Sequence, residues 1–368
     1  MVLISFADLV DAARTGNVTL LQQCTPADVV HININQYSYT KSRYTVRKQK
    51  STVLHIAAKN GHDAFITALY NLFSDTIDVN ARDNDDYTPL SLAALYGHSS
   101  CITALHTCFG DTIDANAVNK DRRNALMIAA KNGHPSCITT LHTCFGDKID
   151  YNAVDKFSKH NILMLAASSG HSSCITTIFN IYGDKIDCNA VDDYNSNVLM
   201  QAASFGHADC ITALHACFGD KINYNAVNKY NNNVLMLAVL HHNVDCITAI
   251  YNTYGNKINY NAIDTYKHNA LKIAARFGRI DCIKALYNTY GDSFDCRVEE
   301  HNALTIIVNN GHSNCLKKVF SIYYDRTDND EHNLLMESAR YGHVACITSL
   351  NYVHGDTLDC NAIYKYNK

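Results

Sequence analysis

The sequence predicts an all-α solenoid of stacked helix-turn-helix units that carry β-hairpin or loop fingers. Three observations predict this fold. The phrase Leu-x-x-Ala-Ala-x-x-Gly-His recurs along the 368-residue chain, a Thr or Asn precedes each copy, and a second apolar helical stripe follows. Two short helices bury too little apolar surface alone, so adjacent units must stack on one another.

The Gly of the repeated phrase sets the period. It falls at positions 61, 97, 133, 170, 206, 278, 311 and 342, with His242 in the same slot, so most units lie 36 residues apart. Leu9, Ala12, Ala13 and Gly16 fit the same frame ahead of position 61, which makes about ten units.

These units predict one domain over residues 1–368. We expect an N-terminal capping repeat at 1–25, a basic, Tyr-containing insertion or enlarged finger at 26–50, and regular repeats at 51–295. Residues 296–368 have repeats with shortened linkers and a C-terminal end that stops inside a hairpin.

Each unit begins with a short helix. Its first slot holds side chains that accept first-turn N–H groups, and a Gly ends it. The cap slot holds Thr52, Thr88, Asn124, Asn161, Asn197, Asn233, Asn269, Asn302 and Asn333.

A second helix follows the first in each unit. Cys101, Ile102, Leu105 and Phe109 recur at helical spacing, and Gly110 should end this helix. Asp-x-Asn-Ala and a polar segment then predict a turn or hairpin before the next cap.

The chain resembles the ankyrin-repeat family. Tyr87-Thr-Pro-Leu-Ser-Leu-Ala-Ala-Leu-Tyr-Gly-His98 matches the family's first-helix signature, and Asp114-Ala-Asn116-Ala117 matches its hairpin entry. The period here is about three residues longer than the family's ~33, and the second helix should therefore run about a turn longer. The resemblance implies a scaffold that binds proteins and needs no cofactor.

The stretch CITALHTCFGD, residues 101–111, places two thiols and an imidazole close together. The Cys101 slot, however, also holds Phe65, and the His106 slot also holds Tyr and Phe, so we interpret these side chains as packing residues rather than metal ligands or a thiol site. The repeated His after Gly bridges neighbouring turns in the ankyrin family. No unit supplies the four ligands that a zinc ion needs, and we expect no metal.

Bulk composition excludes several functions. A net charge of −4 argues against nucleic acid as a partner, and no apolar run reaches the ~18 residues of a membrane helix. Fifteen cysteines without a secretory signal indicate free thiols in a reducing cytoplasm. The absence of nucleotide-binding and hydrolase motifs, and of a separate catalytic domain, predicts that the chain is not an enzyme.

Candidate binding residues lie in slots that stacking does not need. We expect a monomer that binds proteins through its finger tips and the concave ends of its first helices, where exposed Tyr beside cations is typical of interfaces. The alternative is that the tyrosines only stiffen the array. The candidates are Phe157, Tyr194, Tyr230 and Tyr266 in the finger slot, Lys120, Arg122, Arg123 and Lys229 beside it, and Tyr96, Phe205, Phe277 and Tyr341 at the helix ends.

A second candidate surface is the stretch 31–50, which alternates like a β-ribbon. It could offer a basic hook to an acidic protein, nucleic acid or membrane surface, or be a solvated loop. Its cations are Lys41, Arg43, Arg47, Lys48 and Lys50.

The resemblance also implies a modification. In ankyrin proteins of animal cells the hairpin Asn can be hydroxylated, and the matching positions are Asn80, Asn116, Asn152, Asn189, Asn225, Asn261 and Asn361. Abundant Asn, Tyr, Ile and Lys suggest an AT-rich genome, and ankyrin proteins of such organisms are often effectors of intracellular bacteria or products of large DNA viruses or protists. A secreted effector delivered into a host cytosol is one expectation; the alternative is a structural spacer or targeting module from a larger multidomain protein.

Overall fold

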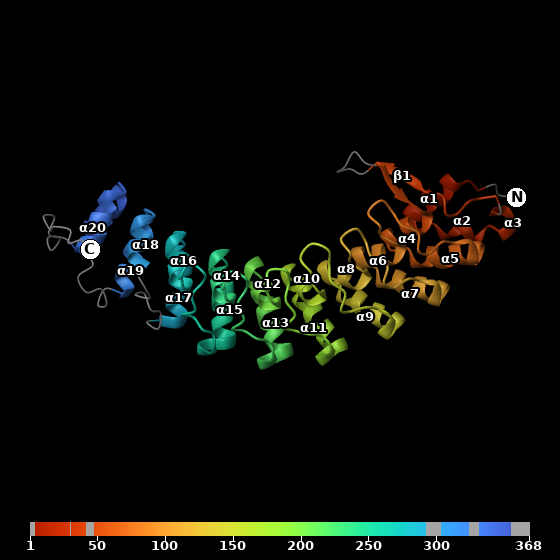
Figure 1. Cartoon of the computed structure of the whole chain (residues 1–368). Helices are drawn as coiled ribbons and strands as arrows, with labels where there is room; N and C mark the ends of the chain where they lie inside the picture. Colours follow the sequence, from red (N-terminus) through yellow and green to blue (C-terminus); the bar gives the residue numbers. More distant parts are fainter. Residues whose placement is uncertain (1–3, 30, 42–47, 292–302, 324–330, 355–368) are drawn as a thin grey trace. The chain divides into compact units, whose positions relative to one another are not determined.

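The computed structural model describes residues 4–29, 31–41, 48–291, 303–323 and 331–354. The chain divides into two compact units, Met1–Asp193 and Tyr194–Lys368. Each unit consists of helix pairs, so the predicted all-α solenoid is confirmed for both (Figure 1).

In the first unit the first helices of successive repeats pack side by side in one row, and the second helices pack in another. The first helices are α1 (Phe6–Thr15), α4 (Val53–Asn60), α6 (Pro89–Tyr96), α8 (Ala125–Lys131) and α10 (Ile162–Ser168). The second helices are α2 (Val18–Gln22), α5 (Asp63–Phe73), α7 (Ser99–Phe109), α9 (Pro135–Phe145) and α11 (Ser172–Tyr182).

The second unit repeats the same two-row arrangement. Its first helices are α12 (Val198–Phe205), α14 (Val234–Leu240), α16 (Ala270–Arg276), α18 (Ala303–Asn309) and α20 (Glu331–Arg340). Its second helices are α13 (Ala208–Phe218), α15 (Val244–Tyr254), α17 (Ile280–Tyr290), α19 (Ser313–Tyr323) and α21 (Val344–His354).

Side-chain capping fixes the start of the first helices. The Asn124 carboxamide oxygen accepts the Met127 N–H at 3.0 Å, and its nitrogen donates to the Asp150 carbonyl of the next hairpin at 2.8 Å. One Asn therefore caps its own helix and ties it to the neighbouring repeat. The predicted caps at Thr52, Thr88, Asn161, Asn197, Asn233 and Asn269 are confirmed. The prediction for Asn333 was wrong, because α20 begins two residues earlier, and Asn302 lies outside the described residues.

The three extra residues of the period lie where the second helix ends. In most repeats an 11-residue helix stops at a Gly or Ser and a short 3₁₀ turn follows, as in α7 and the turn Gly110–Thr112. Gly110 has φ of 49° and ψ of −126°, a conformation that only Gly adopts without strain. The remaining 3₁₀ turns are Ser74–Thr76, Gly146–Lys148, Gly183–Lys185, Gly219–Lys221 and Gly255–Lys257.

A short helix and the two strands precede the second repeat. The helix α3 (Pro26–Val29) is followed by β1 (Ser38–Lys41), which pairs antiparallel with β2 (Lys48–Ser51). Asn35 donates to the Thr76 carbonyl at 2.7 Å and accepts the Asp78 N–H at 2.8 Å, the same bonds that later hairpin asparagines make. The first finger therefore keeps the ordinary hairpin entry, and its enlargement starts after Asn35.

The repeated His is a tie between first-helix turns. The Nε2 atom of His98 lies 3.1 Å from the Lys59 carbonyl oxygen of the preceding repeat. Gly61 has φ of +81°, and a Cβ at this position would lie 2.8 Å from the His98 ring, so the Gly is needed for its conformation and for space. Asn243 and Arg279 occupy the His slot in two repeats and donate to the same kind of carbonyl.

Candidate functional site

The finger tips are fixed by their own backbone. In the second unit the Asn228 oxygen accepts the N–H groups of Tyr230 and Asn232 at 2.9 and 3.0 Å, which closes the finger. The Thr265 N–H donates to the Tyr230 carbonyl at 3.1 Å, so each tip is held against the next tip.

Aromatic side chains project from these fixed tips into solvent. Tyr194, Tyr230 and Tyr266 are 52%, 54% and 69% exposed, and in the first unit Phe157 is 67% exposed. Most large apolar side chains in this chain are buried, so exposure of one slot in successive repeats is a distinct surface feature. We name Tyr194, Tyr230 and Tyr266 the tyrosine fingers.

A second set of exposed aromatics lies at the C-terminal ends of first helices. It comprises Tyr96, Phe205, Phe277 and Tyr341. Tyr96 and Tyr341 stack on the His two residues later, with ring centres 6.5 and 6.2 Å apart. Stacking on the His ties limits their motion without hiding their outer faces.

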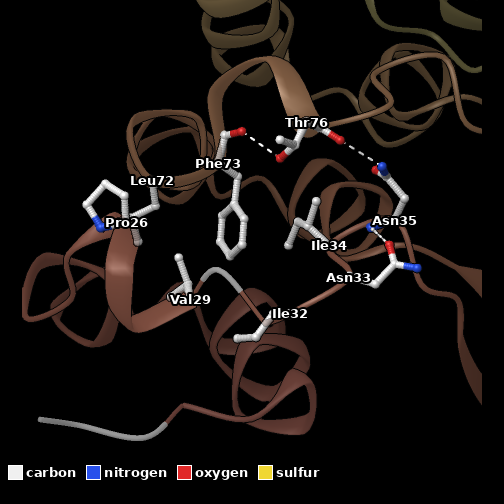
Figure 2. Close-up of a pocket in the computed structure, with 9 residues that line it drawn as sticks. All are labelled: Pro26, Val29, Ile32, Asn33, Ile34, Asn35, Leu72, Phe73 and Thr76. Atoms are coloured by element: carbon white, nitrogen blue, oxygen red, sulfur yellow. Dashed lines mark hydrogen bonds between the residues drawn. The ribbon is translucent and has the colours of Figure 1, made fainter.

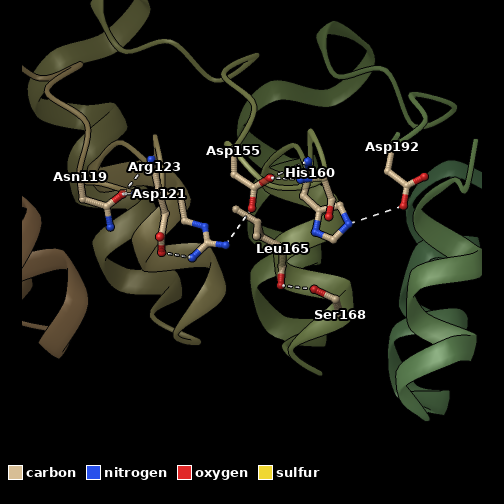
Figure 3. Close-up of polar contacts among 9 residues, drawn as sticks. Asn119, Asp121, Arg123, Asp155, His160, Leu165, Ser168 and Asp192 are labelled. Carbon is tan, nitrogen blue, oxygen red and sulfur yellow. Dashed lines mark hydrogen bonds and ion pairs between the residues drawn. The ribbon is translucent and has the colours of Figure 1, made fainter. Parts of the chain in front are cut away.

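Two finger cations of the first unit pair with carboxylates of the array, and Figure 3 shows the contacts of Arg123. Arg123 donates to the Asp155 carboxylate at 2.7 Å and to Asp121 at 2.8 Å, and its side chain is only 12% exposed. Lys120 lies 3.6 Å from Asp85 of the preceding finger. Although the sequence groups Arg123 with the exposed cations, the structure places it in an ion pair between fingers, while Arg122 is exposed.

The Asp155 carboxyl is the best-buried group of this network. Burial opposes its ionisation, but the Arg123 hydrogen bond, the Ser158 and His160 N–H groups and the Arg123 charge together hold its pKa below the usual value of 3.8. One finger further, the His160 Nε2 lies 3.6 Å from an Asp192 carboxylate oxygen. At positions 123 and 160 the residue before the cap thus reaches the acid at the base of the next finger.

In the second unit this slot holds Ser196, Asn232 and His268, and Asn232 does not bridge to the next finger. Asn232 occupies the slot of Arg123 and His160, is 7% exposed, and its carboxamide oxygen has no hydrogen-bond partner among the described residues. Asn is shorter than Arg or His and leaves Asp264, the acid of the next finger, unbridged. A cavity of about 250 Å³ opens here, lined by Tyr230, Asn232, Leu240, Asp264, Tyr266, His268, Ile273, Arg276 and Phe277.

The sequence did not identify this cavity. It shows Tyr230, Tyr266 and Phe277 as separate candidates, and the structure brings them together around one opening. Comparing the residue before each cap does not single it out, because Ser51 and Ser196 also place short side chains in this slot. Lys229 is exposed, and in the described part of the chain neither it nor Arg276 pairs with a carboxylate.

A second cavity of about 410 Å³ lies near the N-terminal end of the first unit (Figure 2). Val29, Ile32 and Ile34 face Leu72 and Phe73 across it, and the Asn35–Thr76 hydrogen bond closes one side. The described residues that line this cavity include no charged side chain.

Four of the five cations of the basic insertion lie outside the described residues or have only their backbone described. Arg43 and Arg47 fall in the first group, while Lys41 and Lys48 are paired across β1 and β2. Lys50 lies with its Nζ 3.7 Å from the centre of the Tyr37 ring.

The hairpin asparagines are structural ties. Asn116 donates to the Lys148 carbonyl and accepts the Asp150 N–H, each at 2.7 Å. Asn80 and Asn225 make the equivalent pairs of bonds, and Asn361 lies outside the described residues.

The thiols and imidazoles of the second helices pack between repeats. Cys101 and Cys137 are buried, and burial raises the pKa values of their thiols to about 12 and about 11, which keeps them protonated. The His106 ring packs edge-on against Phe145 of the next repeat at 5.2 Å between ring centres. Within the described ranges, no three His, Cys, Asp or Glu side chains gather as metal ligands would.

Among the helices of the described residues, none is long and apolar enough to cross a membrane.

Comparisons with known proteins agree with this architecture. The family profile described as ankyrin repeats (3 copies) matches residues 9–114, 101–192, 163–264, 199–298 and 271–361. No curated protein sequence gives a significant match.

Solved structures show the same fold at low identity. The ankyrin-repeat domain of Bcl-3, described as a unique member of the IkappaB protein family, is 19% identical with a TM-score of 0.52, covering 64% of this chain and 98% of that chain. The human ASB11 ankyrin-repeat domain is 19% identical with a TM-score of 0.50, covering 65% of this chain and 98% of that chain. Because the profile matches together extend from residue 9 to residue 361, the chain belongs to the ankyrin-repeat family.

Proposed function

We propose that this chain is a non-enzymatic scaffold that binds one or more partner proteins through its finger tips and the adjacent ends of its first helices. Ankyrin-repeat domains are generally protein-interaction modules, typically without catalytic activity. The observation that carries the proposal is the exposure of the tyrosine fingers on a rigid backbone. Tyr gives a large contact area at low cost in side-chain entropy and is enriched where binding energy concentrates.

The side chains around the tyrosine fingers also suit a protein-binding surface. Phe205 and Phe277 are exposed on the second unit, and Lys229 lies directly before a finger tyrosine. Aromatic and cationic groups of this kind can cover the ~800 Å² that a stable interface buries on each partner. In the first unit we retain Phe157, Lys120, Arg122 and Tyr96 as part of the proposed surface, and in the second Tyr341. We leave Arg123 out of this surface, because its guanidinium pairs with Asp121 and Asp155.

Replacing Tyr194, Tyr230 and Tyr266 together with Ser tests the proposal. Because these side chains are more than half exposed, we expect the helical circular dichroism and the thermal midpoint to change little, while partner capture falls at least tenfold. The matched control is Tyr352→Ser, which removes an aromatic side chain that is also exposed but lies in α21 rather than on a finger. Quantitative mass spectrometry of proteins captured by wild type and both variants gives the comparison, and equal capture by the triple variant would refute the assignment.

We also propose a reducing cytosol as the site of action, supported by the 13 described cysteines, all of them free. Delivery into a host cell as an effector rests on composition alone, and a reporter fusion that signals only from the host cytosol would test it. We further propose that the hairpin asparagines are hydroxylated. An intact protein mass raised by one oxygen atom per modified Asn would support this proposal.

A further inference from the structure

We propose that the cavity beneath Tyr230 and Tyr266 is an anchor site for a single apolar side chain from an acidic, extended segment of a partner protein. This inference rests on the proposed function and specifies the chemistry of the partner. It follows from three properties of the cavity: its size, its one unpartnered polar atom and the uncompensated charge at its rim.

The size of the cavity selects a side chain rather than a small molecule. Its volume of about 250 Å³ lies below the ~300–1,000 Å³ of typical small-molecule sites. Leu240, Ile273 and Phe277 line it together with the two tyrosine rings. An apolar side chain in this space would bury surface that now meets water, which favours binding.

The buried polar atom sets the orientation of the segment. The Asn232 carboxamide oxygen is shielded from solvent and accepts no hydrogen bond from a described residue. An unsatisfied buried acceptor is costly, and an arriving backbone N–H would relieve that cost. Asp264 cannot fulfil this role in the same way, because its Oδ1 already accepts the Tyr266 and His268 N–H groups at 2.8 Å each.

The charge at the rim selects an acidic segment. The Arg276 guanidinium lies 5.8 Å from the Tyr266 and Phe277 ring centres, and the Arg279 guanidinium lies 5.3 Å from Phe277. Arg276 has no carboxylate partner in the described part of the chain, whereas Arg123 in the first unit has two. A guanidinium that stacks on aromatic rings and has no carboxylate partner among the described residues can pair with a partner's carboxylate.

The array itself provides a variant that closes the cavity. His160 stands in the slot of Asn232 two repeats earlier in the sequence, and its Nε2 lies 3.6 Å from the carboxylate of Asp192 in the next finger. Asn232→His should place an imidazole toward Asp264 in the same way, fill the cavity and satisfy the site internally. Because the slot already holds His at 160 and 268, this substitution should leave the fold intact.

The test uses a phage library of random 12-residue peptides selected on the full chain. We expect the enriched peptides to combine Asp or Glu with one Leu, Ile, Met or Phe. Synthetic copies should lose affinity at least tenfold with Asn232→His and with Arg276→Glu, and by a similar factor between 0.05 and 0.5 M NaCl. The matched control is Lys185→Glu, which reverses an exposed charge in a 3₁₀ turn of the first unit, away from the proposed binding surface, and should leave the affinity within twofold.

The outcomes separate this inference from the proposed function. Two outcomes would refute the anchor site but not the proposed binding face. The selected peptides could require the tyrosine fingers but be basic, or they could bind Asn232→His as tightly as wild type. If no selected peptide depends on Tyr230 or Tyr266, the proposed face and the anchor site both fail. Thermal unfolding of each variant, expected within a few degrees of wild type, shows that the losses are not due to misfolding.

Discussion

The Arg123–Asp155 pair offers the sharpest test of what holds the fingers in register. Its side chains are 12% and 2% exposed, and two oxygens of neighbouring fingers accept from one guanidinium (Figure 3). Arg123→Met keeps most of the side-chain volume but leaves Asp155 with only backbone donors. Removing one partner of a buried ion pair costs ~3–5 kcal/mol, and the remaining Ser158 and His160 N–H groups place our expectation near the lower end, at about 3 kcal/mol.

The loss should depend on pH. The pKa of Asp155 is lowered in the folded protein, so its contribution to stability is present above the unfolded pKa and is lost as the pH falls through the folded pKa. In Arg123→Met burial should raise the pKa of Asp155. The difference in unfolding free energy between wild type and variant should therefore be largest near neutral pH and narrow below about pH 4.

Urea unfolding and amide hydrogen exchange together measure this effect. Exchange at Ser158 and His160 reports the finger directly, since both amides donate to Asp155. Lys120→Met is the control, because the Lys120–Asp85 pair is exposed and should contribute about 0.5 kcal/mol or less. A loss below 1 kcal/mol for Arg123→Met, or a loss that does not change with pH, would refute the reasoning.

Three further substitutions, at two positions, test the repeat contacts. His98→Ala removes the bond to the Lys59 carbonyl and should lower the free energy of unfolding by about 1 kcal/mol. His98→Asn should recover part of this loss, because Asn243 makes such a bond naturally. Equal stability of wild type and both variants in urea unfolding would contradict the role of the His tie. Cys101→Val should change the free energy of unfolding by less than about 1.5 kcal/mol. Burial raises the pKa of the wild-type Cys101 thiol to about 12, so this thiol should react with a thiol reagent only after unfolding. Rapid labelling of Cys101 in the folded protein would contradict its burial.

The sequence was most informative where one slot could be compared across repeats. The Cys101 slot also accepts Phe65, which indicates packing, and both side chains are fully buried. The helix caps and the His ties could be predicted for the same reason, because a repeated position must form hydrogen bonds with the same backbone groups in each repeat. Asn35 was missed because Asn-Ile-Asn replaces the Asp-x-Asn-Ala phrase, although the carboxamide bonds are the same.

The functional face could be predicted only in part. Exposure of the tyrosine fingers follows from their slot, but the pairing of Arg123 depends on an acid 32 residues later that lies beside it only after stacking. The cavity at Asn232 depends on the length of one side chain relative to the gap between two fingers. Neither distance is encoded in the pattern of a single repeat.

The residue before the cap also has a consequence for how such an array diversifies. The core around each finger is the same whether this slot holds Arg, His or Asn, because the closed fingers rely on the backbone bonds to the Asx residue at their base. A codon for Asn becomes one for His by a single base change. Duplicated repeats could therefore gain or lose a binding pocket in one mutational step, and shift it along the chain, without passing through an unstable intermediate.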